Sequence, residues 1–299
     1  MRQTVLVTGG SGFVAGWCIV ELLKAGYSVR TTVRSAAKQA GVRAAVGKAV
    51  DASDRLSFAI ADLSRDDGWD AAVAGCDYVL HVASPMSDPA SRAAQALIGP
   101  AREGTLRVLG AAVRSGVRRV VMTSSCAAVN RGLQSGDTEN DETVWTDIGD
   151  PDLNAYRLSK VLAERAAWDF MREHGGATEF VTVLPSAIFG PALTLENLGS
   201  VQLIERQLSG RMPGVPNVGF CVVDVRDLAL LHVSAMTAPA AAGERFIAAG
   251  DFVWMADVAR ILRTRLGARA AKVPTRRLPD FLVRLFARFI PAMKPLVPM

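Results

Sequence analysis

The chain has 299 residues, of which 50% are hydrophobic and 21% are charged, and its formal net charge is +5. This length and composition exclude an intrinsically disordered chain and allow one large domain or two smaller ones. The sequence predicts neither a zinc site nor a disulfide framework, because no CxxC spacing relates Cys18, Cys76, Cys126 and Cys221. No apolar run reaches the roughly 18 residues that span a bilayer, and no secretory signal precedes the first strand-like run. We therefore expect a reduced, cytoplasmic protein.

Short apolar runs alternate with helical patterns along the first part of the chain. The strand-like runs are QTVLVT, YSVRTTVR, LSFAIADL, CDYVLHVAS, RRVVMTSS and EFVTVLP. Helical spacing occurs between them, in WCIVELLKAG, TLRVLGAAVRSG and LSKVLAERAAWDFMREHG. The runs lack the alternation of a half-exposed sheet, which indicates parallel strands covered by helices on both faces. The sequence therefore predicts an α/β fold with a doubly wound parallel sheet of the Rossmann type.

The composition changes after Pro185. The segments PSAIFGPALTLENLGS and SGRMPGVPNVGF are rich in Pro and Gly, and the later segments have mainly helical patterns. We expect residues 1–185 to form the parallel-sheet domain and residues 186–299 to form mainly a smaller lobe. Residues from about 222 to 238, within VVDVRDLALLHVSAM, are expected to return to the first domain.

The stretch TGGSGFVAG connects the first predicted strand to the first predicted helix, with Gly9, Gly12 and Ala15 at G-x-x-G-x-x-A spacing. The first glycine permits a tight turn, the second lets a diphosphate approach the backbone, and the third position needs a small residue for packing. Backbone amides at the start of the helix, at Phe13 and Val14, can then hold phosphate oxygens. Glycine-rich turns are structural in many proteins, but this position in a βαβ unit favours a dinucleotide.

The end of the second predicted strand indicates which dinucleotide is bound. A site for NAD usually presents an acid there, whereas this chain has Arg34, with Lys38 one turn further. Two cations suit a 2′-phosphate and therefore predict NADP(H), the alternative being solvated surface residues. Asp62 and Leu63, at the end of the third strand, are positioned to meet the adenine, although Asp62 could equally cap the next helix.

Polar residues of a catalytic type follow later in the chain. TSSCAAVN places Ser125 at the carboxyl end of a strand, where doubly wound folds bind ligands, and Ser124 is its rival for that position. Tyr156 and Lys160, in AYRLSK, share one face of a helix. An ammonium beside a phenol favours release of its proton, but the Tyr–Lys spacing alone is weak because it also arises by chance.

Taken together, TGxxGFxxG, the strand-end TSS, YxxxK and PSxxFGP resemble the extended short-chain dehydrogenase/reductase family. The stretches TVR, HVASPM, TSSCAAVN and AAWDF are most similar to its branch of dihydroflavonol 4-reductases, cinnamoyl-CoA reductases and bacterial aldehyde reductases. The resemblance extends from Thr4 to about Leu266. It implies NADPH-dependent reduction of an aldehyde or ketone, with an NADP-binding first domain, a substrate-binding second lobe, and a monomer or homodimer.

The resemblance also implies roles for individual residues. Tyr156 would be the general acid, Lys160 would tune it, and Ser125 would orient the substrate carbonyl. Further implied contacts are Val82 and Ser84 along the nicotinamide ribose, Pro185 at the nicotinamide, Ser200 at a phosphate, and Ser84 and Asn130 at the substrate. One departure is that GTLRVL carries Arg107 where many extended members have Asn.

Other functions are weighed against this hypothesis. The same Ser, Tyr and Lys would serve a 3β-hydroxysteroid-type dehydrogenase, and a nucleotide-sugar epimerase or dehydratase shares the scaffold but usually retains NAD. A non-enzymatic NADP-sensing protein would be expected to have lost those three residues. His81, His174 and His232 form no HExxH or other paired spacing, so no metal site is predicted.

The basic charge is concentrated at the end of the chain. Residues 260–299 contain ten Lys and Arg and one acid, a net charge of +9, which leaves −4 for the rest. The overall charge therefore does not predict nucleic-acid binding. One helical face of this tail would carry Phe281, Leu282, Leu285, Phe286 and Phe289. A helix lying on a membrane is one interpretation, but we favour a helix packed over the substrate pocket or in a subunit contact, and no membrane partner.

Overall fold

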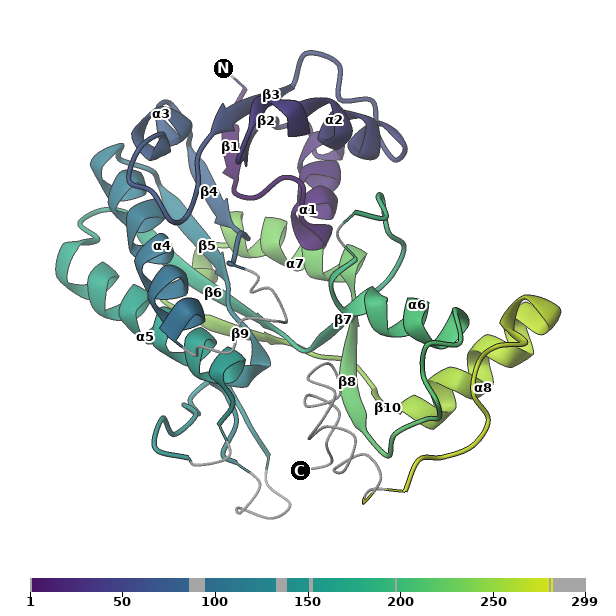
Figure 1. The fold of residues 1–299 in the computed structure, drawn as a ribbon. Helices are drawn as coiled ribbons and strands as arrows, with labels where there is room; N and C mark the ends of the chain where they lie inside the picture. Colours follow the sequence, from purple (N-terminus) through teal and green to yellow (C-terminus); the bar gives the residue numbers. More distant parts are fainter. Residues whose placement is uncertain are drawn as a thin grey trace.

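The computed structural model describes residues 2–85, 95–132, 139–150, 153–196, 198–279 and 281. Its main sheet is entirely parallel and has the strand order β3-β2-β1-β4-β5-β6-β9. Those strands are β1 (Thr4–Val7), β2 (Ser28–Val33), β3 (Leu56–Ile60), β4 (Tyr78–His81), β5 (Arg119–Thr123), β6 (Glu179–Pro185) and β9 (Arg245–Ala248). The order reverses between β1 and β4, which confirms the predicted doubly wound α/β fold (Figure 1).

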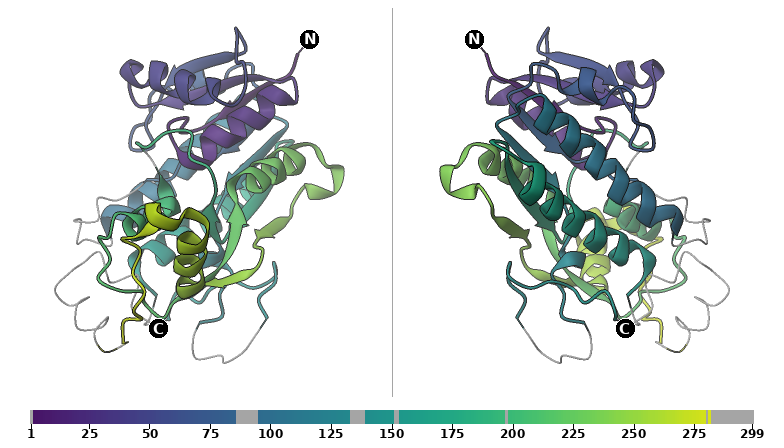
Figure 2. Two further views of the ribbon diagram at one scale, coloured as in Figure 1. Left: turned by 90° about the vertical axis from the view of Figure 1, so that its right-hand side faces the viewer. Right: turned by 90° about the vertical axis from the view of Figure 1, so that its left-hand side faces the viewer.

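Helices cover both faces of the main sheet (Figure 2). One face packs against α1 (Phe13–Lys24), α2 (Gln39–Gly47) and α7 (Val225–Thr237), and the other against α3 (Trp69–Val73), α4 (Gln95–Arg114) and α5 (Ala155–His174). Each face has its own apolar core, because strand residues such as Val5 and Leu6 point alternately to the two sides. Burial on both sides explains why the strands are continuous apolar runs in the sequence.

A second, three-stranded sheet lies beside the carboxyl half of the main sheet, on the right in Figure 1. It has the order β10-β8-β7, with β7 (Ala187–Phe189) parallel to β8 (Gly219–Asp224) and β10 (Phe252–Trp254) antiparallel to it. The helices α6 (Gln202–Leu208) and α8 (Met255–Leu266) accompany this sheet around a small core that includes Met212 and Met255. The sequence predicts mainly helices in this region, because strands of three to six residues between Pro and Gly give little periodic signal.

The chain crosses between the two sheets after residue 185. Residues 222–224 lie in β8 of the small sheet, and α7, which follows directly, packs against α1 and the main sheet. β9 then pairs with β6, with Thr182 opposite Arg245 and Pro185 opposite Ala248. Short 3₁₀ helices occur at η1 (Ala36–Lys38), η2 (Cys126–Ala128), η4 (Gly199–Val201), η5 (Pro239–Ala241) and η6 (Gly267–Ala270). The division into two functional domains at residue 185 stays a prediction.

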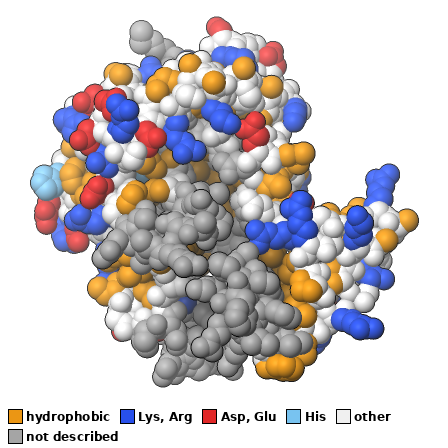
Figure 3. All heavy atoms as spheres, viewed as in Figure 1, with side chains coloured by type: hydrophobic (Ala, Val, Ile, Leu, Met, Phe, Trp, Pro, Cys, Tyr) orange, Lys and Arg blue, Asp and Glu red, His pale blue; other side chains and the backbone are white. Residues whose placement is uncertain are grey.

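The basic end of the chain forms a local feature of the surface. Lys and Arg side chains gather over the projection that carries α6 and α8 (Figure 3), and the exposed cations of this region are Arg260, Arg263, Arg265, Arg269, Lys272, Arg276 and Arg277. Phe281 is exposed, whereas Leu282, Leu285, Phe286 and Phe289 of the predicted tail helix lie outside the described residues. Among the helices of the described part, none has the length and apolarity needed to cross a bilayer.

Candidate active site

The carboxyl ends of the parallel strands meet along one edge of the main sheet, where doubly wound folds bind their ligands. The segments that follow these strand ends contain most of the site residues predicted from the sequence. They are Gly9–Val14 after β1, Arg34–Lys38 after β2, Asp62 and Leu63 after β3, Val82–Ser84 after β4, Ser125 after β5 and Pro185 at the end of β6. Asn130, Ser200 and the pair on α5 do not directly follow a strand of the main sheet, so their positions depend on tertiary structure.

The glycine-rich turn between β1 and α1 has the geometry of a phosphate-binding turn. Gly9 has a φ of +73°, and a Cβ there would lie 2.9 Å from the Cβ of Ala83, so both conformation and space require glycine. The Gly12 amide donates to the Gly9 carbonyl at 2.8 Å, which closes the turn. No side chain caps α1, whose first turn therefore presents its backbone amides to a ligand. These features fit a dinucleotide diphosphate.

The two predicted cations both lie at the carboxyl edge. Arg34 and Lys38 are exposed, which leaves their head groups accessible to a phosphate. Lys38 also lines a cavity of about 220 Å³ that begins at Gly12 and Phe13 of the turn. The Lys38 ammonium forms an ion pair with the Glu196 carboxylate at 2.9 Å. No local sequence pattern indicates this pair, because the two residues are far apart in the chain. The site therefore fits a cofactor with a 2′-phosphate, and the Lys38 ammonium is paired with the Glu196 carboxylate in this structure.

Asp62 is held in a local turn after β3. Its Oδ1 atom accepts hydrogen bonds from the Ser64 amide at 2.9 Å and the Ser64 hydroxyl at 2.8 Å. These bonds, assisted by the charge of Arg34, hold the pKa of Asp62 below its usual value. Asp62 does not cap the next helix, because the N-cap of α3 is Gly68. Arg107 donates to the Leu63 carbonyl at 2.9 Å and pairs with Asp66, so it fastens this same loop.

The end of β4 is organised around His81, which is buried. Its Nε2 atom lies 3.4 Å from the Thr105 hydroxyl, and its Nδ1 atom lies 3.0 Å from the Thr8 hydroxyl. The Thr8 hydroxyl also accepts from the Ala83 amide at 2.9 Å, which fixes the path of the segment containing Val82 and Ser84. Burial, with a smaller contribution from the charge of Lys160, lowers the pKa of His81 to about 3, so its ring is neutral.

Tyr156 and Lys160 lie on the first two turns of α5. The helix begins after Asn154, whose side-chain oxygen accepts from the Arg157 amide at 2.9 Å. Tyr156 is 53% exposed, whereas Lys160 is only 9% exposed. The Lys160 charge contributes to the low pKa of His81, so the ammonium is within electrostatic range of the carboxyl end of β4. The phenol is therefore accessible to a ligand, and the ammonium is held beneath the surface.

The two serines after β5 have different environments. Ser124 is buried and its hydroxyl donates to the Oε2 atom of Glu164 at 2.5 Å. Ser125 is half-buried, begins η2, and its Oγ atom accepts from the Ala127 amide at 3.2 Å. Its hydroxyl proton can therefore be donated to a ligand. Alternation along the chain directs Ser124 into the structure and leaves Ser125 at the edge.

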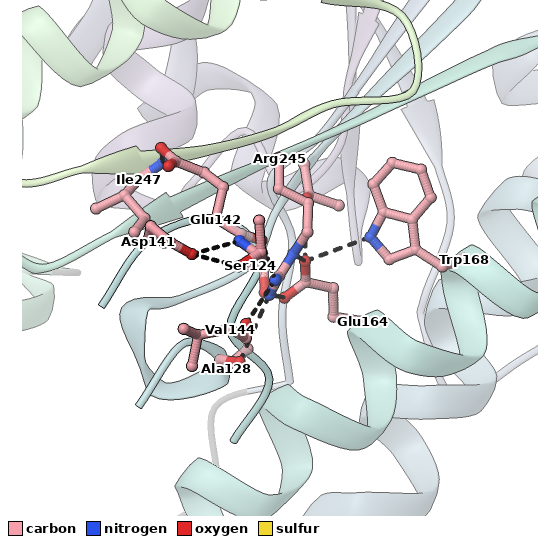
Figure 4. A network of polar contacts seen from close by, with 11 residues as sticks. Ser124, Ala128, Asp141, Glu142, Val144, Glu164, Trp168, Arg245 and Ile247 are labelled. Atoms are coloured by element: carbon pink, nitrogen blue, oxygen red, sulfur yellow. Dashed lines mark hydrogen bonds and ion pairs between the residues drawn. The ribbon is translucent and has the colours of Figure 1, made fainter. Parts of the chain in front are cut away.

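Ser124 belongs to a buried polar network centred on Glu164 and Arg245 (Figure 4). The Nε atom of Arg245 contacts the Oε1 atom of Glu164 at 2.9 Å, and Thr182 donates to the same oxygen at 3.0 Å. Arg245 also donates to the Glu142 and Val144 carbonyls, at 2.7 and 2.8 Å, and its guanidinium lies 3.8 Å from the centre of the Trp145 ring. The network thus connects α5 to β6, to β9 and to residues 142–144.

Three further predicted contacts surround this edge. Asn130 forms a local turn, in which its side-chain oxygen accepts from the Gly132 amide at 2.8 Å. Pro185 is buried at the end of β6, and the next residue, Ser186, has a buried hydroxyl with no hydrogen-bond partner among the described residues. Ser200 is exposed on η4, which lies against the start of α1, since a Cβ at Gly199 would stand 3.6 Å from the Phe13 ring.

Some candidate residues were missed from the sequence. The Ser186 hydroxyl, which has no partner among the described residues, could bond a polar group of a bound nicotinamide. The position of Ser186 directly after Pro185 in the motif PSAIFGP is the sequence feature that could have indicated it. Glu164 follows Lys160 by one helical turn, but its partner Arg245 is 81 residues away, so no local pattern indicates the pair. Within the described part of the chain, no three His, Cys, Asp or Glu side chains are grouped so that they could hold a metal ion.

The chain is similar to known proteins in sequence and in fold. Residues 5–250 match the model of the NAD dependent epimerase/dehydratase family. Cinnamoyl-CoA reductase 1 of Petunia hybrida is 37% identical over 268 residues, 87% of this chain and 76% of the petunia protein. The putative anthocyanidin reductase of Ginkgo biloba is 36% identical over 288 residues, 91% of this chain and 82% of that protein.

Solved structures are similar across nearly the whole chain. The crystal structure of yeast methylglyoxal/isovaleraldehyde reductase Gre2 complexed with NADPH aligns with a TM-score of 0.82 and 28% identity, covering 91% of this chain and 85% of that one. Vestitone reductase from alfalfa aligns with a TM-score of 0.72 and 27% identity, covering 99% of this chain and 97% of that one. The similarity therefore includes both sheets.

Proposed function

The chain belongs to the NAD dependent epimerase/dehydratase family of extended short-chain dehydrogenases/reductases, and we propose that it is an NADPH-dependent reductase of aldehydes or ketones. Its relatives include reductases of cinnamoyl-CoA and of methylglyoxal and isovaleraldehyde, and the yeast enzyme is complexed with NADPH. For this chain the use of NADPH is supported by Arg34 and Lys38, which stand where an NAD site usually carries an acid.

The observation that carries the proposal is the difference in exposure between Tyr156 and Lys160, which lie one turn apart on α5. The exposed phenol is available to a substrate, and the buried ammonium is within electrostatic range of His81, at the carboxyl edge where β4 ends. That edge also holds the phosphate-binding turn and the Ser125 hydroxyl. A proton donor, a hydroxyl and a dinucleotide turn at one sheet edge are the parts that carbonyl reduction requires.

Each residue would have a separate part in the reaction. The reduced nicotinamide supplies a hydride when it is bound. The Ser125 hydroxyl would donate a hydrogen bond to the substrate carbonyl oxygen and orient it, and the Tyr156 hydroxyl would give its proton to the same oxygen. The buried Lys160 ammonium would hold positive charge beside the phenolate that remains, which favours proton release. Proton transfer and charge stabilisation would thus be supplied by the protein.

We propose that the substrate is a small-molecule carbonyl compound that carries a bulky aromatic or apolar group. This is supported by the relatives named for cinnamoyl-CoA, which carries an aromatic ring, and for isovaleraldehyde, which has a branched apolar chain. Ser84 and Asn130 are the residues that we assign to substrate contact, together with Val82, Pro185 and Ser200 on the cofactor. The side-chain amide nitrogen of Asn130 remains a candidate donor because its oxygen is engaged by Gly132.

The proposal is tested by NADPH oxidation with a panel of carbonyl compounds. We expect turnover of at least one aromatic or branched aliphatic aldehyde, ketone or dihydroflavonol, with NADPH used in preference to NADH. UDP-glucose and a 3β-hydroxysteroid with NADP⁺ serve as substrates for the alternative functions. Protein that binds 2′,5′-ADP but turns over no carbonyl compound would contradict the proposal, and conversion of UDP-glucose to its epimer would replace it.

A further inference from the structure

Residues 190–196, which follow β7, form a loop that extends from the small sheet to α1 and α2. The Trp17 indole donates to the Pro191 carbonyl at 2.8 Å, and the Lys48 ammonium donates to the Leu193 carbonyl at 2.7 Å. Leu193 also packs against α1, since a Cβ at Gly16 would stand 3.2 Å from its Cδ1 atom. These contacts hold the loop on α1 and α2 without any contribution from Glu196.

Glu196 lies at the end of this loop and contacts a predicted cofactor ligand. Its carboxylate is 2.9 Å from the Lys38 ammonium, and both side chains are more than half exposed. The hydrogen bond and the charge of Lys38 lower the pKa of Glu196, so the carboxylate is ionised at neutral pH. The contacts at Pro191 and Leu193 hold the preceding part of the loop on α1 and α2, and Glu196 lies close enough to pair with Lys38.

Lys38 and Glu196 both line the cavity that starts at the phosphate-binding turn, together with Gly12, Phe13 and Thr194. An anion that enters beside the turn and reaches Lys38 therefore meets a carboxylate already paired with it. A phosphate monoester carries more charge than a carboxylate and has three acceptor oxygens, so it can displace Glu196 from Lys38. The repulsion between the two anions opposes that binding.

We propose that Glu196 is a cofactor-specificity residue: it is the counter-anion of Lys38, it is displaced by the 2′-phosphate of NADPH, and it thereby moderates the preference for NADP(H) over NAD(H). This inference rests on the proposed use of NADPH. An exposed ion pair contributes little free energy, so the effect on affinity is modest, about two- to five-fold. The effect is expected only for ligands that carry a 2′-phosphate, which distinguishes it from a general effect of net charge.

The test is calorimetric binding of two nucleotide fragments, which needs no catalytic turnover. The probes are 2′,5′-ADP, which carries the 2′-phosphate, and 5′-AMP, which lacks it. Glu196→Gln is expected to bind 2′,5′-ADP about two- to five-fold more tightly than the wild-type chain at low ionic strength, with 5′-AMP binding unchanged. The gain is expected to shrink as salt is added and to vanish in the Lys38→Met background, because the competition then has no target.

Glu205→Gln is the matched control, because it removes the carboxylate of another exposed ion pair, with Arg211 at 3.4 Å. An equal gain in this variant would overturn the proposal by assigning the effect to net charge. Unchanged binding of 2′,5′-ADP in Glu196→Gln, while Lys38→Met weakens it, would overturn the role of Glu196 and leave the NADPH assignment intact. Equal affinity of the wild-type chain for both probes would instead overturn the cofactor assignment, and the role of Glu196 with it.

Discussion

At the scale of single residues, neighbours in the sequence have different surroundings. Ser124 and Ser125 are adjacent, yet one hydroxyl is buried against Glu164 and the other lies half-buried at the sheet edge. Alternation predicts that only one of them faces a ligand, but it does not say which, because the partner of Ser124 lies 40 residues further along the chain. The same limit applies to Lys38, whose partner Glu196 lies in a distant loop.

The two serines provide a matched prediction. Ser125→Ala is expected to lower kcat by about 10²-fold with little change in the melting temperature, since it removes a donor to the substrate oxygen. Ser124→Ala is expected to lower the free energy of unfolding by about 1–3 kcal/mol, since it removes the shorter of two hydrogen bonds to the buried Oε2 atom of Glu164, which keeps the 3.4 Å bond from Arg245. Steady-state kinetics and urea denaturation of both variants measure the two effects. The reverse pattern would assign the substrate contact to Ser124.

At the scale of elements, the sequence predicted the six strands β1–β6 because each is a continuous apolar run between helices. It did not predict β9, whose four residues form a short edge strand, or the small sheet, whose strands lie among Pro and Gly. Their pairing depends on contacts between distant segments, such as Arg245 with Glu164. α5 was predicted from its periodicity, but its attachment through this pair was not.

The ion pair between Glu164 and Arg245 is expected to be a major support of α5. Arg245→Met leaves the Glu164 carboxylate buried without its cation, which is expected to cost about 3–5 kcal/mol of the free energy of unfolding. Asp169→Asn on the same helix breaks an exposed pair with Arg172 and is expected to cost less than about 1 kcal/mol. Urea denaturation measures both. Similar costs for the two variants would show that burial does not determine the strength of the Glu164 pair.

At the scale of the whole molecule, two buried histidines link folding to pH. Burial lowers the pKa of His81 to about 3 and that of His232 to about 4, from 6.5. Nδ1 of His232 donates to the Leu228 carbonyl at 2.8 Å, and its Nε2 atom lies 2.7 Å from the Thr123 hydroxyl. Both rings are thus neutral in the folded chain, whereas the unfolded chain protonates them below pH 6.5.

The contribution of these two histidines to the free energy of unfolding is therefore expected to be fully present above pH 6.5 and to decrease as the pH falls toward 4. Each histidine contributes a slope of up to about 1.4 kcal/mol per pH unit in this range, because the unfolded state binds one more proton per histidine. Urea midpoints measured between pH 7 and pH 4.5 test this. His232→Gln is expected to reduce the slope by about half, and a flat profile for the wild-type chain would contradict the assignment of neutral buried rings.

The proposal for the whole molecule is that Tyr156 delivers a proton to the same carbonyl group that receives a hydride. The most direct measurement is the reduction of an accepted aldehyde or ketone with NADPH in which both hydrogens at nicotinamide C4 are replaced by deuterium, with the alcohol analysed by mass spectrometry. We expect one deuterium in each product molecule, and a decrease in kcat of at least about 10²-fold in Tyr156→Phe with NADPH binding retained. An alcohol without the label, or a rate unchanged in Tyr156→Phe, would contradict the mechanism.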